Sequence, residues 1–153
     1  MFGARSKDKE ETVPTMRQAM DMYFFLKNAD KKMNAVIEPV MREIAERLHS
    51  QGQESVIAKQ CQALSSNGNL QHRNISLILV TGNKRPACNV SSYPAIAFVA
   101  NSDRGTLWVR ERSIGPDWKK ERSTGEYQID AITRQLVEKH IITWLHRLSA
   151  KSG

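Results

Sequence analysis

The apolar residues between positions 15 and 49 recur at steps of three and four, which is the spacing of one face of an α-helix. The series consists of Met22, Phe25, Ala29, Met33, Val36, Ile37, Val40, Ile44 and Leu48. Asn28-Ala29-Asp30 offers a place for a break, and Pro39 removes a backbone donor and crowds the preceding turn. A helical hairpin and one kinked helix both fit. We favour one long helix, bent near Pro39 and ended by Ser50-Gln51-Gly52.

Three segments in the middle of the chain have the patterns of β-strands. Residues 75–81 form a nearly continuous apolar run, rich in β-branched side chains, as in a buried strand. Residues 94–100 predict a second strand, and turn residues at 101–105 join it to a third at 106–112, where apolar and polar side chains alternate. A short fourth strand is predicted at 125–129.

The remaining two elements differ in how clearly the sequence defines them. Ile57, Cys61 and Leu64 keep helical spacing, so residues 54–64 predict a short helix, although the segment is also short enough for a strand. Asp130 has the side chain of an N-cap. The helix predicted to follow it has a broad apolar stripe made by Ile132, Leu136, Val137, Ile141, Trp144, Leu145 and Leu148.

This order of elements predicts a single α+β domain. Its antiparallel sheet would have three to four strands, flanked by the long N-terminal helix and the C-terminal helix. We expect residues 1–14 to be a flexible lead-in and residues 15–150 to form the domain. The predicted core contains Ile44, Leu48, Leu77, Leu79, Ile96, Phe98, Leu107, Val109, Leu136, Ile141 and Leu145.

Composition narrows the class of protein. Of the 153 residues, 40% are hydrophobic and 25% are charged, as in globular proteins. No apolar run approaches the roughly 18 residues of a membrane span, and no secretory signal is visible at the start, so we expect a cytoplasmic protein without a membrane partner. Cys61 and Cys88 are too few and too isolated for a disulfide framework or a zinc site.

The sequence contains no recognisable catalytic pattern. Its four histidines, at positions 49, 72, 140 and 146, lack the spacing of a helical metal pair. Glycine-rich phosphate loops and the nucleophile elbow of serine hydrolases are absent from the sequence. We therefore predict no catalytic residues, no metal and no cofactor, and we expect a binding protein rather than an enzyme.

A surplus of basic residues favours a polyanionic partner, because Lys and Arg that contact phosphates release bound counterions. The chain has 23 Lys and Arg against 16 Asp and Glu, a formal net charge of +7. The surplus is spread over the chain: residues 1–50 hold nine basic and eight acidic side chains, residues 51–100 four and one, and residues 101–153 ten and seven. No basic tail concentrates it.

The strand predicted at 106–112 carries the most specific chemical signal. Alternation places Trp108, Arg110 and Arg112 on one side of it. Aromatic rings that stack on bases, beside guanidinium groups that contact phosphates, are typical of sheets that bind single-stranded nucleic acid. We predict a non-catalytic nucleic-acid-binding protein. Its basic surface would be extended by Lys119, Lys120 and Arg122 and, if the loops lie close together, by Lys84 and Arg85.

Two alternatives accompany this hypothesis. Trp108 could simply cover the edge of the core, with Arg110 stacked over it. The N-terminal helix also has more apolar surface than one stripe needs, and its methionines are Met16, Met20, Met22, Met33 and Met41. Helix faces rich in Met and aromatic residues suit partner grooves and homodimer interfaces. The alternative function is therefore a protein-assembly module with no nucleic-acid role, self-associating through Met20, Tyr23, Phe24 and Phe25.

Overall fold

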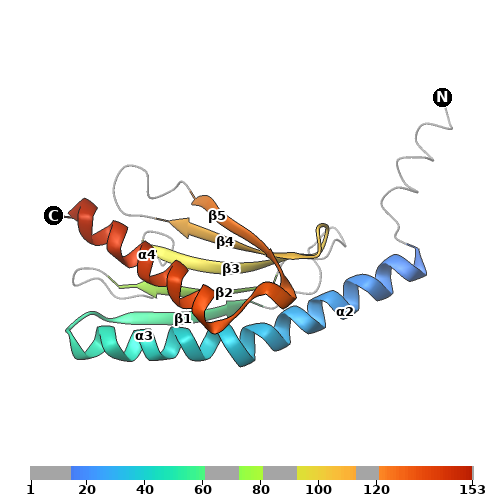
Figure 1. Cartoon of the computed structure of the whole chain (residues 1–153). Coiled ribbons are helices and arrows are strands. Elements are labelled where there is room, and N and C mark those ends of the chain that lie inside the picture. The colour runs from blue at the N-terminus through green and yellow to red at the C-terminus, as the bar shows by residue number, and fades with distance from the viewer. Residues whose placement is uncertain (1–14, 61–72, 81–92, 113–120, 153) are drawn as a thin grey trace.

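One continuous helix opens the fold of this computed structural model, which describes residues 15–60, 73–80, 93–112 and 121–152 (Figure 1). It consists of α2 (Met16–Lys32), a π-helical turn η1 (Met33–Ile37) and α3 (Glu38–Ser50). Thr15 and Gln18 form a capping box at its start: each side chain bonds the other residue's backbone N–H, at 3.1 and 2.9 Å. The single long helix of the sequence prediction is confirmed.

The distortion expected from Pro39 lies in the turn that precedes it. In a regular α-helix the ring of Pro39 would collide with the carbonyl of Ala35. In η1 the backbone instead takes five-residue spacing, with the N–H of Glu38 donating to the carbonyl of Met33. Figure 1 shows α2 and α3 at an angle to each other.

The sheet has five antiparallel strands, each paired with its neighbour in the chain. They are β1 (Ser55–Gln60), β2 (Asn74–Leu79), β3 (Ala95–Asn101), β4 (Thr106–Arg112) and β5 (Glu121–Gln128). The α+β class is confirmed, and the expected count of three to four strands is too low. β5 also begins four residues before the strand predicted there, because polar residues of this edge strand are held by pairing with β4.

The prediction of a short helix at 54–64 is wrong over residues 55–60, which form the strand β1. Gly52, at φ 89°, ends α3 in a conformation that favours glycine and turns the chain back toward the sheet. The β-branched residues Val56 and Ile57 then lie opposite Ile78 and Leu77 of β2. The helical spacing depended on residues beyond β1, and those positions lie outside the described part of the chain.

The C-terminal helix begins later than expected. Residues Ile129–Ala131 form a 3₁₀ turn, η3, and α4 runs over Arg134–Ser152. The predicted N-cap Asp130 lies within η3. Thr133 takes that role, since its hydroxyl accepts a hydrogen bond of 3.2 Å from the N–H of Leu136. A threonine directly before the helix competes better for its free amides than an aspartate three residues earlier.

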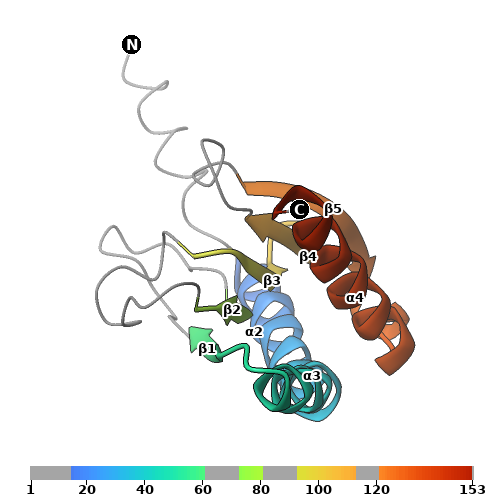
Figure 2. The same ribbon diagram turned by 90° about the vertical axis from the view of Figure 1, so that its left-hand side faces the viewer.

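The helices pack on one face of the sheet, and the core lies between these two layers (Figures 1 and 2). Most of the predicted core members are buried: Ile44, Leu77, Leu79, Ile96, Phe98, Leu107, Val109 and Ile141. Leu48, Leu136 and Leu145 are partly buried and pack against the core. Trp144, expected only as part of the α4 stripe, is among the largest fully buried side chains.

A glycine on β5 makes room for a partly buried polar contact beneath α4. The β4–β5 register shifts between Val109 and Arg110, and the ring of Tyr127 lies against the strand at Gly125. From there the Tyr127 hydroxyl shares a 2.7 Å hydrogen bond with Nε2 of His140 on α4. Burial lowers the pKa of His140 below its usual 6.5, which favours the neutral ring at physiological pH.

We expect Gly125→Ala to lower the free energy of unfolding by about 1–3 kcal/mol, the usual cost of overpacking. A methyl group there would lie 2.7 Å from Cε2 of Tyr127 and would push the ring away from His140. Urea denaturation measures the loss. Ser123→Ala, on the exposed side of the same strand, is the control and should change stability by less than about 0.5 kcal/mol. A G125A protein as stable as the wild type would contradict this packing.

Candidate nucleic-acid and protein interfaces

The sheet face opposite the helices brings together the three central residues of the nucleic-acid hypothesis. Along β4, Leu107, Val109 and Glu111 are buried on the helix side. Trp108, Arg110 and Arg112 alternate with them and lie, partly buried, on the other face. None of the described helices covers this face, which we call the open face (Figure 2).

Small side chains surround the centre of this triplet. Arg110 lies opposite Ala97 of β3 and Ser123 of β5, and Ala97 in turn lies opposite Ser76 of β2. Side chains opposite one another in antiparallel strands share a face, so Arg110 stands in a row of short residues. Arg110 itself is partly buried in this row, with its Nε atom below the surface.

A carboxylate lies beside the tryptophan. Glu126 of β5 is opposite Trp108 and accepts hydrogen bonds of 2.7 Å from the Thr106 hydroxyl and from Nε of Arg104. Thr106, then the Trp108 indole and Arg104, lower the pKa of Glu126 to about 2, so it is ionised at neutral pH. Nε1 of Trp108 is buried and helps to lower the pKa of Glu126, although its geometry is not that of an aligned hydrogen bond.

One arginine of the open face, Arg112, is also positioned by the protein. Nε of Arg112 donates a 2.8 Å hydrogen bond to the backbone carbonyl of Tyr93, at the start of β3. This bond fixes the guanidinium near Ile78 and Ala95, which form a small apolar cluster with Tyr93. The side chain is thereby ordered before any ligand arrives, which reduces the entropy lost on binding.

The other predicted site residues do not join this triplet in the described structure. Arg122 is opposite Glu111, a residue of the helix side, so the register directs it away from the open face. The four remaining candidates, Lys84, Arg85, Lys119 and Lys120, lie outside the described residues. The described part of the candidate interface therefore consists of Trp108, Arg110 and Arg112, with Glu126 at its edge.

A second exposed surface lies on α2. Met16, Met20, Tyr23 and Phe24 have exposed fractions of 82, 52, 58 and 52%, and we call these four residues the α2 stripe. The rings of Tyr23 and Phe24 pack edge to face, with centroids 5.4 Å apart. Phe25 was expected on the same surface, but it is partly buried and packs against the core. Figure 1 shows α2 extending past the end of the sheet.

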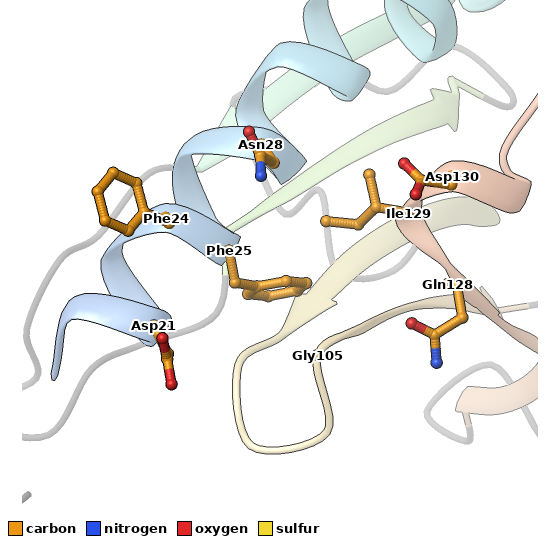
Figure 3. Close-up of a pocket in the computed structure, with 8 residues that line it drawn as sticks. All are labelled: Asp21, Phe24, Phe25, Asn28, Gly105, Gln128, Ile129 and Asp130. Carbon is orange, nitrogen blue, oxygen red and sulfur yellow. The ribbon is translucent and has the colours of Figure 1, made fainter. Parts of the chain in front are cut away.

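Between α2 and the end of β5 lies a cleft of ≈ 370 Å³. Its lining comes from three parts of the chain: Asp21, Phe24, Phe25, Asn28, Gly105, Gln128, Ile129 and Asp130. Figure 3 shows Phe25 and Ile129 directed into the space between the two elements, with Asp21 and Asp130 on opposite sides. No sequence pattern marks this cleft, because its residues come together only through the docking of α2 beside η3.

Within the described ranges, no group of three or more His, Cys, Asp or Glu side chains is placed to hold a metal ion. No helix among the described residues combines the length and apolar character needed to cross a bilayer. Comparisons of the chain with protein-family models, curated protein sequences and solved structures found no match. Function is therefore inferred from the chemistry of the two surfaces.

Proposed function

We propose that the protein binds single-stranded nucleic acid on the open face of its sheet and performs no catalysis there. The observation that supports this proposal is the alternation of Trp108, Arg110 and Arg112 along β4, on a face that the described helices leave uncovered. Trp108 stacks on a base, and the two guanidinium groups contact phosphates of the same strand. The net charge of +7 favours the same class of ligand.

The neighbours of the triplet suit an extended strand rather than a duplex. Short side chains, those of Ser76, Ala97 and Ser123, stand in the same row as Arg110, and we propose that the nucleic-acid backbone crosses the sheet along this row. Glu126 repels phosphate at the edge near Trp108 but can accept hydrogen bonds from the amino groups of bases. We propose that Lys84, Arg85, Lys119 and Lys120 extend the phosphate-binding surface.

Titration of a labelled oligonucleotide at several salt concentrations tests this proposal. Each phosphate contact should contribute about −0.7 to the slope of log K against log salt for a single strand. Arg110→Ala should flatten the slope by roughly one contact. Trp108→Ala should weaken binding by about 1–3 kcal/mol at unchanged slope, because stacking releases no counterions.

Arg122→Ala is the matched control, because it removes the same charge from the neighbouring strand but on the helix side. It should leave the slope nearly unchanged. A slope that flattens equally in R110A and R122A would indicate diffuse attraction and contradict the assignment to the open face. Absence of binding at low salt would overturn the proposal.

Protein assembly through α2, with no nucleic-acid role, is the second candidate function. The observation that favours it is the α2 stripe, in which four large apolar side chains are each more than half exposed. Apolar groups clustered on one helix face are typical of surfaces that bury against another protein.

A further inference from the structure

We infer that the partner of the α2 stripe is a second copy of this chain, paired antiparallel with α2 and centred on Met20. This inference depends on the assembly function proposed above and names its partner. The paired helices would bury both stripes in one symmetric interface.

The stripe is separated from the side of α2 that packs on the domain. At 100° per residue, its four members fall within a sector of about 100°. Leu26 and Ala29, the buried residues of α2, lie on the other side of the helix. A second copy can therefore approach the stripe without displacing any contact of α2 with its own core.

In the described part of the chain, the beginning of α2 stands exposed. Every residue from Thr15 to Asp21 is exposed, and the side-chain hydrogen bonds described at this end are those of the Thr15–Gln18 capping box. The end of a helix frays where packing does not hold it. Packing of Met16 and Met20 against another helix would stabilise this end.

The sequence of α2 is complementary to itself in the antiparallel direction. With Met20 opposite Met20 on the two-fold axis, Met16 of each copy lies opposite Phe24 of the other. Arg17 and Asp21 flank the stripe on the same side. In this register Arg17 of one copy lies within one helical turn of Asp21 of the other, and symmetry creates this ion pair twice.

The cleft beside α2 extends this complementarity. Asp21 and Asp130 line it together with the aromatic rings of Phe24 and Phe25. The side chain of Arg17 from the other copy fits this chemistry, since its aliphatic part can pack on the rings while its guanidinium reaches the carboxylates. A standard protein–protein interface buries about 800 Å² per partner, which is more than the four side chains of the α2 stripe supply. The cleft adds buried area to the interface. Because the total remains modest, we expect a dissociation constant in the micromolar range.

Sedimentation equilibrium of the full chain tests the inference. The wild type should show a mass approaching twice 17.4 kDa across the micromolar range. Met20→Glu should weaken association by roughly 100-fold, because it places two carboxylates together on the axis. Ile142→Glu on α4 is the matched control: its isoleucine is 54% exposed, similar to Met20, and the variant should associate like the wild type. Circular dichroism checks that each variant is folded.

A charge exchange tests the register separately from assembly. Arg17→Glu and Asp21→Arg should each weaken the dimer, and R17E/D21R should restore it. If M20E abolishes the dimer but R17E/D21R does not recover the association that the two single charge variants lose, the antiparallel register is overturned while assembly through α2 stands. A dimer insensitive to M20E would overturn the role of the stripe in assembly, and a wild-type monomer at all concentrations would overturn self-association itself.

Discussion

Replacing Phe98 with alanine is expected to lower the free energy of unfolding by about 3–5 kcal/mol. Phe98 is fully buried on the central strand β3, opposite Ile75 of β2 and Val109 of β4. Its ring meets His140 of α4 edge-on, with centroids 6.5 Å apart. The substitution removes an aromatic ring from the junction of sheet and helix and leaves a cavity that the paired strands cannot close.

Urea denaturation followed by tryptophan fluorescence measures this loss. Phe24→Ala removes the same ring from an exposed position and should change stability by less than about 0.5 kcal/mol. Both variants should be compared at protein concentrations too low for association. Equal effects of F98A and F24A would contradict the placement of Phe98 at the centre of the core.

The second large effect is expected at the partly buried ion pair between β4 and α4. Nη2 of Arg147 donates to both carboxylate oxygens of Glu111, which is only 6% exposed. Arg147→Met should cost about 3 kcal/mol, because it leaves a buried carboxylate without its partner. This value is at the low end for buried pairs, since the Arg147 side chain is 38% exposed.

A double-mutant cycle separates the free energy of the ion pair from that of the side-chain packing around it. Glu111→Met combined with R147M removes both charges and should recover most of the stability lost in R147M alone. Calorimetric melting of the two single variants and the double variant measures the coupling. Additive losses in the double variant would contradict an ion pair as the source of the effect.

The parts of the fold that the sequence predicts correctly are those with a strong local pattern. β2, β3 and β4 follow from apolar runs and alternation, and the N-terminal helix follows from its three- and four-residue spacing. β1 could not be distinguished from a helix, because Ile57 satisfies both patterns within a short segment. The start of β5 is polar, so only its pairing with β4 reveals it.

In the candidate site, too, the features that depend on one strand alone are predictable from the sequence, and those that depend on neighbouring elements are not. The common face of Trp108, Arg110 and Arg112 is predictable, since alternation within one strand needs no knowledge of its neighbours. The direction of Arg122 depends on the register with Glu111, which the sequence does not encode locally. Likewise, the inward turn of Phe25 depends on where α2 meets the sheet, which the run Tyr23-Phe24-Phe25 does not reveal.

The two proposed interfaces use different layers of the molecule. The nucleic-acid interface lies on the sheet, and the self-association interface lies on the helix that extends past it (Figure 1). In a protein that has both interfaces, M20E should leave the salt slope of oligonucleotide binding unchanged, and R110A should leave the sedimentation mass unchanged. Each substitution thus serves as a specificity control for the other proposal.

The order of the strands has a consequence for how the chain folds during synthesis. Each strand pairs with the one before it, so the sheet can grow hairpin by hairpin as the chain leaves the ribosome. Among the described contacts, two that span long loops are made at and just before the start of α4: Lys32 reaches the carbonyl of Ile132, 100 residues away, and Arg134 pairs with Glu43, 91 residues away. Until α4 emerges, part of the sheet's apolar face stays uncovered. Ribosome-bound chains ending before residue 134 should therefore depend most on chaperones.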